Sequence, residues 1–157
     1  MFPSHDQEGD NNVAVGRAAL SANTTADNNT AIGHQALEQN TTGFANTALG
    51  TSAGDALTTG NNNIAIGVNA LGADTLGDRS VAIGNEALLT QNLTTTTDVY
   101  NVAIGHQALK LNTTGNKSVA VGGLALQSST TGIDNVGVGY GALNANTTAS
   151  NNTAVGS

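Results

Sequence analysis

The hydrophobic pattern of the chain is one short phrase that recurs nine times: a β-branched or aliphatic residue, Ala, an aliphatic residue and Gly. Gly137 is the one departure from Ala. The glycines stand 17 residues apart, except for the 21 residues between Gly84 and Gly105. A period this strict predicts a stack of similar coils, in which each coil covers the apolar surface of its neighbours. The repeat glycines are Gly16, Gly33, Gly50, Gly67, Gly84, Gly105, Gly122, Gly139 and Gly156.

Each phrase predicts a short strand. Neighbouring side chains of a strand point to opposite faces, so Val81 and Ile83 share one face and Ala82 lies on the other. We expect the branched face to fill the core. The small alanine face should then allow another structure to approach closely.

A second apolar segment follows each glycine. Ala recurs three residues after it in all eight complete copies, and Leu comes next in all but one, which has Gly54. A turn sequence such as Asn40-Thr41-Thr42-Gly43 then follows, and its side chains can bond to nearby backbone. Only about six residues separate the glycine from the turn, too few for a stable helix. We therefore expect two short strands per coil and an all-β fold, a parallel β-solenoid or β-roll of about nine 17-residue coils.

The repeat also sets the domain organisation. Residues 11–157 are expected to form a single β-solenoid domain, and residues 1–10 a non-repeat lead or junction. Four extra residues fall within 91–98 and predict a loop on one face, either a binding face or a tolerated insertion. Residues 152–157 and 1–11 together complete one 17-residue period. That phase suggests either a piece of a longer repeat tract or rods that stack head to tail.

Composition favours an assembly. Aromatic residues make up 3% and charged residues 10% of the chain, and the apolar residues are mostly Ala and Val. The core should therefore be thin, so burial against other chains has to supply part of the stability, and we expect an oligomer. The net charge of −7, with four scattered Lys and Arg residues, argues against nucleic acid as a partner. No apolar run is long enough to insert into a membrane.

Residues suited to catalysis or metal binding form no recurring set. No Ser, His and acidic residues repeat in a pocket-forming pattern, and the acidic residues form no column of the calcium-binding type. His34 and His106 hold equivalent positions four coils apart, too far to share a metal ion. We expect no enzyme activity, no cofactor and no metal.

The repeat phrases resemble those of a known family. Ser80-Val81-Ala82-Ile83-Gly84 and Ser118-Val119-Ala120-Val121-Gly122 resemble the motif in the head domains of trimeric autotransporter adhesins, the YadA-like head. The longer phrase from Asn29 to Gly43 is similar to repeats of bacterial surface fibres and phage tail fibres. The resemblance covers residues 11–157 and implies a homotrimer of left-handed β-rolls, intertwined or side by side. It implies an extracellular structural and adhesive segment, on a cell surface or a virion, that binds a host surface protein or glycan.

Threonines supply the candidate surface. In most coils one stands eight positions after the glycine, and stacked coils would align these residues into a row about 4.8 Å apart. Such a row makes an ice-binding solenoid the alternative function, while turn chemistry also explains it. The candidates are Thr24, Thr41, Thr58, Thr113, Thr130 and Thr147 of the row, together with Thr94, Thr95, Thr96 and Thr97 of the insertion.

Overall fold

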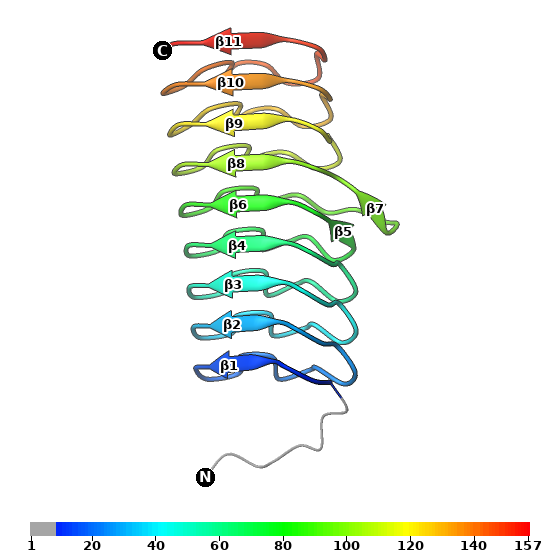
Figure 1. Cartoon of the computed structure of the whole chain (residues 1–157). Helices are drawn as coiled ribbons and strands as arrows, with labels where there is room; N and C mark the ends of the chain where they lie inside the picture. The colour runs from blue at the N-terminus through cyan, green and yellow to red at the C-terminus, as the bar shows by residue number, and fades with distance from the viewer. Residues whose placement is uncertain (1–8) are drawn as a thin grey trace.

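The computed structural model describes residues 9–157, so most of the expected lead over residues 1–10 lies outside the described part. The described chain winds into one column of stacked coils, with the strands lined up on one side (Figure 1). Nine strands pair in chain order into a parallel sheet, and residues 9–157 contain no helix. The predicted all-β parallel β-solenoid with a 17-residue spacing is thus confirmed.

Each strand of this sheet is three residues long and ends directly before a repeat glycine. Equivalent residues of successive coils are directly paired, so that Ala14 lies beside Ala31 and Ala31 beside Ala48. The nine strands are β1 (Val13–Val15), β2 (Thr30–Ile32), β3 (Thr47–Leu49), β4 (Ile64–Ile66), β6 (Val81–Ile83), β8 (Val102–Ile104), β9 (Val119–Val121), β10 (Val136–Val138) and β11 (Thr153–Val155). A separate two-stranded parallel sheet joins β5 (Gly77–Asp78) to β7 (Thr97–Asp98).

The two faces of the strands are the reverse of the expectation. The strand alanines from Ala31 to Ala120 point into the solenoid and are at most 1% exposed, while the flanking Val, Ile and Leu residues point outward. The physical reason is the narrow interior. The strand alanines pack in one cluster with the Ala-Leu pairs that follow the glycines, for example Ala36 and Leu37. Because leucine fills the space on one side, only a methyl group fits on the other.

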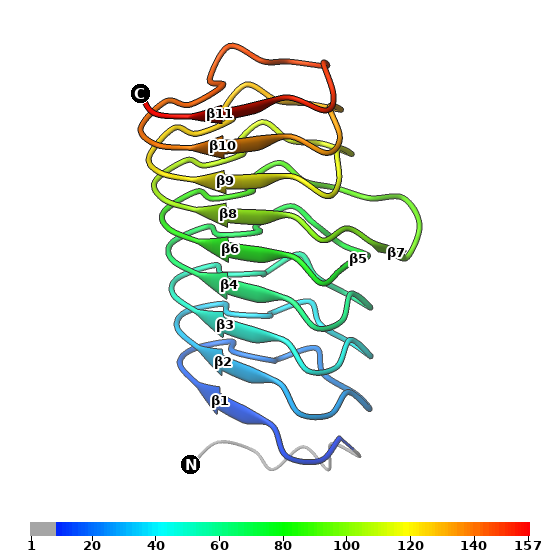
Figure 2. The same ribbon diagram turned by 45° about the horizontal axis from the view of Figure 1, so that its top comes forward.

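The predicted second strand of each coil is also wrong, because this segment is a series of turns. Two of its positions have positive φ, for example Gln35 at 60° and Leu37 at 50°, and extended strands have negative φ. The turns still bond from coil to coil, as where Leu37 N donates to Ala53 O at 3.1 Å. Figure 2 shows the strands on the near side of the stack and these bent segments behind them.

The repeat glycines are required by both conformation and space. All nine have φ between 127° and 141°, a region that L-residues with side chains rarely adopt. A Cβ atom added to Gly67 would also lie 2.6 Å from the carbonyl of Gly84 in the next coil. The backbones of adjacent coils therefore touch at this column, which explains the strictness of the glycine repeat.

A buried row of asparagines runs beside the strands, four positions before each glycine. Asn46 Nδ2 donates to Gly60 O at 2.8 Å, and its Oδ1 accepts a bond from Asn63 N at 2.9 Å. Each side chain thus ties its own coil to the turn of the next one and satisfies buried backbone groups. Ser80 and Ser118 replace asparagine in two coils.

Candidate functional site

The outer face of the nine-stranded sheet is apolar and uncovered. Parallel sheets are normally covered on both faces, and here the solenoid interior covers only one. The exposed large apolar residues of this sheet face are 37–78% exposed. We call them the sheet-face stripe: Val13, Val15, Ile32, Leu49, Ile64, Ile104 and Val155. The outward residues of the other strands, such as Val81 and Ile83, are half-buried.

The insertion forms a second distinctive surface. It projects from the edge of the stack where the strands begin, and β7 at its end pairs with β5 of the preceding coil (Figure 1). Thr94, Thr95, Thr96 and Thr97 are all exposed there, and Thr97 Oγ1 donates to Thr95 O at 3.2 Å. The structure therefore brings these four predicted candidates together on one protruding loop.

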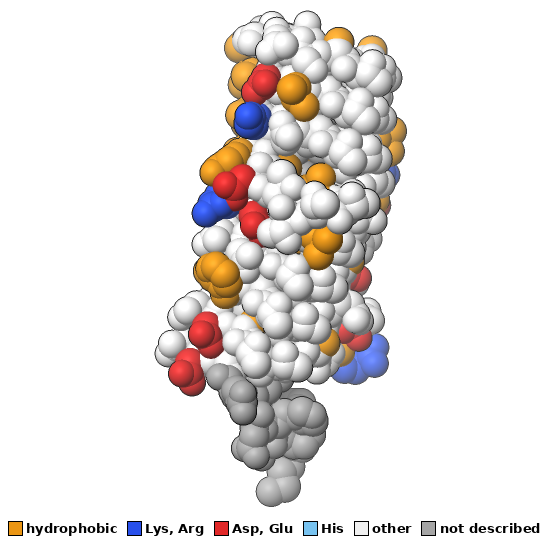
Figure 3. All heavy atoms as spheres, turned by 90° about the vertical axis from the view of Figure 1, so that its right-hand side faces the viewer, with side chains coloured by type: hydrophobic (Ala, Val, Ile, Leu, Met, Phe, Trp, Pro, Cys, Tyr) orange, Lys and Arg blue, Asp and Glu red, His pale blue; other side chains and the backbone are white. Residues whose placement is uncertain are grey.

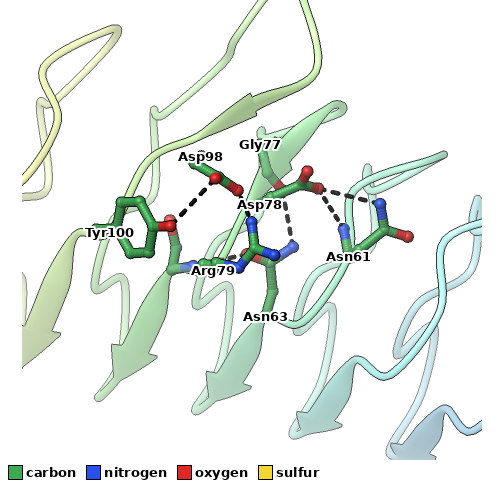
Figure 4. Close-up of polar contacts among 8 residues, drawn as sticks. Asn61, Asn63, Gly77, Asp78, Arg79, Asp98 and Tyr100 are labelled. Atoms are coloured by element: carbon green, nitrogen blue, oxygen red, sulfur yellow. Dashed lines mark hydrogen bonds and ion pairs between the residues drawn. The ribbon is translucent and has the colours of Figure 1, made fainter.

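A charged and aromatic cluster lies at the base of this loop. Asp98 forms an ion pair with Arg79 and accepts a hydrogen bond from Tyr100 Oη at 3.1 Å (Figure 4). The Arg79 guanidinium also lies over the Tyr100 ring, with its carbon 5.9 Å from the ring centroid. Nearby Asp78 accepts a bond from Asn61 N at 2.6 Å. The cluster is half-exposed and rich in hydrogen-bonding groups, which suits it to contact a polar partner.

Buried polar bonds hold the coil beneath the insertion in place. Gln91 Nε2 donates to Asp74 Oδ2 at 2.6 Å and to Ser80 Oγ at 3.1 Å. Its Oε1 accepts a bond from Asn101 Nδ2 at 2.9 Å. Gln91 therefore bridges the asparagine row between Ser80 and Asn101, where the insertion interrupts the repeat. Burial raises the pKa of Asp74, whereas the hydrogen bond from Gln91 opposes that rise.

The predicted threonine row exists, but it lies in turns. Thr41 Oγ1 donates to Thr58 O at 3.1 Å, and the same bond recurs along the row. Thr24, Thr58, Thr113 and Thr130 donate in the same way, and Thr75 Oγ1 donates to Leu93 O at 3.4 Å. Because these hydroxyls are used to join one turn to the next, the geometry supports turn chemistry. Ice binding by this row stays a prediction without support from its geometry.

Two further sets of hydrogen-bonded polar side chains lie at the edge of the sheet where the strands end. Arg17 hydrogen-bonds to His34 in the next coil. Lys110 Nζ contacts Glu86 Oε2 at 2.6 Å, and Gln107 Nε2 donates to the same oxygen at 2.8 Å. The hydrogen bond from Lys110 lowers the pKa of Glu86, and that from Gln107 adds to the effect. Within the described residues, no three His, Cys, Asp or Glu side chains gather into a possible metal site.

Sequence reasoning missed the sheet-face stripe and the cluster around Arg79. The stripe was missed because alternation separates two faces without saying which one is inside. The cluster depends on Asp98 folding back over Arg79 across the insertion, and no spacing rule predicts that contact. Residues 9–157 contain no helix of the length and hydropathy needed to cross a membrane. No protein-family model, curated protein or solved structure matches the chain.

Proposed function

We propose that this chain is a structural and adhesive segment of an extracellular trimeric fibre, built from three left-handed β-rolls side by side. The observation that carries the proposal is the sheet-face stripe, an apolar surface that follows the parallel sheet from β1 to β11. An extended apolar surface of this kind marks an interaction site in a soluble protein. Other copies of the chain fit it best, because the stripe has the same period on every copy.

Three copies are proposed because the repeat phrases resemble those of trimeric adhesin heads. A cyclic arrangement around an axis parallel to the solenoid turns all three sheet faces inward. The strands of each copy would then be covered by the solenoid interior on one side and by the partner chains on the other. This arrangement gives the parallel sheet the two covered faces that such sheets normally have.

The insertion loop is the proposed adhesive surface. Its four threonines offer hydroxyl groups, and the adjacent Asp98, Arg79 and Tyr100 add charge and an aromatic ring. Tyrosine and arginine are enriched where proteins bind partners. The expected partner is a host surface protein or a glycan, met at the cell surface or on a virion.

Head-to-tail stacking of such rods is part of the proposal. Among the described residues, β1 and β11 each pair with a strand on one side only. Unpaired edges of parallel strands accept further strands. A further coil, from the same or another chain, can therefore continue the stack at either end.

Two measurements test the function. Native mass spectrometry is expected to show three chains per particle, or a series of multiples of three if the rods stack. A monomer at micromolar concentration would refute the fibre proposal. Glycan and host-protein arrays then test adhesion. Binding by the wild type should be lost when Thr94–Thr97 are deleted and Asp98 is changed to Gly, the residue found at this turn position in most coils. Binding that survives this change would place adhesion elsewhere on the rod.

A further inference from the structure

The two edges of the sheet carry different charges. We define the strand-start edge as the residues five to seven positions before each repeat glycine, and the strand-end edge as those one and two positions after it. Figure 3 views the molecule from the strand-start edge, where carboxylate, basic and apolar side chains line up among mostly uncharged ones. Asp10, Asp27, Asp78, Asp98 and Asp134 belong to this edge.

The strand-end edge carries basic or imidazole side chains in three of the coils that have an aspartate on the strand-start edge. Its only Arg or His residues within 9–157 are Arg17, His34 and His106. Their own coils carry Asp10, Asp27 and Asp98, in that order, on the strand-start edge.

Within the described residues, the strand-end edge has one carboxylate, and it too has an opposite charge on the strand-start edge of its own coil. It is Glu86, and its coil carries Arg79 on the strand-start edge, beside Asp78. Each charged or imidazole side chain on the strand-end edge therefore has an opposite charge on the strand-start edge of the same coil. On the strand-start edge, Lys117 and Asp134 have no charged counterpart in their own coils. Within one chain the two edges lie on opposite sides of the strands, so these groups are not each other's partners (Figure 1).

Cyclic symmetry brings such edges together. In a ring of three copies the contact is heterologous, so the right side of one copy meets the left side of the next. With the axis parallel to the solenoid, all three copies keep the same coil at the same height. The strand-start edge of one coil then faces the strand-end edge of the equivalent coil in the neighbour.

We propose that the trimer is closed and held in register by pairing these edges coil by coil. Asp10 pairs with Arg17 of the neighbouring protomer, Asp27 with His34 of the neighbouring protomer, and Asp98 with His106 of the neighbouring protomer. This inference rests on the proposed trimer and adds which surfaces touch. A shift by one coil would bring Asp98 opposite Asn85 or Gly123. Such a shift keeps only part of the attraction, Asp27 with Arg17 in one direction or Asp10 with His34 and Asp78 with His106 in the other, so the charges favour the matched register.

The contacts within one chain leave these groups able to pair. Asp10 is exposed, and Asp27 uses Oδ1 to accept a bond from Asp10 N. Arg17 is exposed beside His34, which is half-buried. Asp98 already contacts Arg79 and Tyr100. The first two coils are therefore expected to contribute more to the interface than the sixth.

Paired cysteines test the register, because the chain contains no cysteine of its own. In the double variant Asp27→Cys with His34→Cys, strand β2 separates the two cysteines within a chain by roughly 10 Å, beyond the ~4.4–6.8 Å between Cα atoms that a disulfide spans. Mild oxidation is expected to give disulfide-linked dimers and closed trimers on a non-reducing gel. The mismatched control, Asp27→Cys with Tyr140→Cys, combines the second coil with the eighth and is expected to stay uncrosslinked.

The outcomes separate this inference from the proposed function. A particle of three chains whose matched cysteines do not crosslink overturns the edge pairing and leaves the trimer standing. A monomeric particle overturns both. A charge test supports the gel: Arg17→Glu should raise the trimer dissociation constant at least about tenfold, and adding Asp10→Lys in the same chain should reverse most of that loss. Equal weakening by the single and double variants would contradict the pairing of these two residues.

Discussion

At the scale of single residues, close contact between coils decides which side chains are allowed. The repeat glycines combine positive φ with backbone contact to the next coil.

Limited space inside the solenoid also explains one exception to the repeat in the core. Gly54 replaces the usual leucine, and Leu57 takes the place of a turn asparagine and is fully buried. A Cβ added to Gly54 would lie 3.1 Å from the Leu57 side chain. Leu57 therefore fills the space that the missing leucine leaves.

Gly67→Ala tests the glycine column. The alanine would be strained at a φ of 128°, and its Cβ would meet the Gly84 carbonyl at 2.6 Å. We expect the free energy of unfolding to fall by at least about 2 kcal/mol in urea denaturation. The matched control is Gly123→Ala, one position after a repeat glycine, where the new Cβ makes ordinary contact with the Tyr140 ring at 3.4 Å. That change should cost less than about 0.5 kcal/mol. Equal losses for both variants would contradict this account.

Asp74 makes stability depend on pH. Burial raises its folded-state pKa above the ordinary value of 3.8, so the folded protein binds more protons than the unfolded chain in the pH range between the two pKa values. This contribution to stability is fully present below the unfolded pKa and is lost as the pH rises through the folded pKa. Relative to Asp74→Asn, the wild type should therefore lose unfolding free energy as the pH rises above about 4 and through the folded-state pKa. Urea titrations across that range, with the exposed Asp134→Asn as control, measure the difference. Parallel curves for wild type and Asp74→Asn would rule the effect out.

At the scale of elements, the strands and the period were predictable, whereas the conformation of the connecting segment was not. Short phrases ending in glycine locate all nine strands, since the 17-residue spacing aligns them independently of any long-range contact. The Ala-Leu segment reads as a strand from its composition. Its leucines, such as Leu88 and Leu109, have φ near 50°, a conformation unusual for leucine that burial in the core stabilises. Local sequence preference gives no signal of it.

The insertion is expected to be dispensable for folding. Deleting Thr94–Thr97 and changing Asp98 to Gly restores the 17-residue spacing between Gly84 and the next repeat glycine. Because loop length has a weak effect on stability, the unfolding free energy should change by less than about 1 kcal/mol. Thermal or urea unfolding measures it. A loss of several kcal/mol would instead make the insertion part of the structural core, with Gln91 and Asp74 as its anchor.

At the scale of the whole molecule, the solenoid has a covered interior and one uncovered apolar side. The interior is narrow, because alanine supplies one wall and leucine the other. The exposed Val, Ile and Leu side chains follow the axis of the rod on the outer face of the nine-stranded sheet, where a partner chain can make contacts along the stack. The outer face of the rod thus repeats from coil to coil, and we expect the contacts between assembled chains to repeat with the same period.

Ile104→Asp tests the use of that surface. A carboxylate in the sheet-face stripe would be buried without a partner in the trimer, so native mass spectrometry should show monomers. Leu111→Asp is the matched control, since Leu111 is similarly exposed, at 42% against 37% for Ile104, but lies in a turn outside the sheet. It should leave the mass unchanged. Circular dichroism checks that both variants fold. If Ile104→Asp kept the wild-type mass, the stripe would not be the interface.

The sequence by itself determined the period, the positions of the strands and the parallel stacking, because each coil repeats the same local pattern and bonds only to its neighbours. It also located the insertion and the threonine row. Only the tertiary structure decided which strand face is inside, because the choice depends on the volume left by the leucines across the interior. The bonds of Arg79 with Asp98 and of Gln91 with Asp74 likewise exist only when the coils are stacked. Asp74 and Gln91 are one 17-residue period apart, whereas Arg79 and Asp98 meet across the insertion at a spacing that the repeat does not reveal.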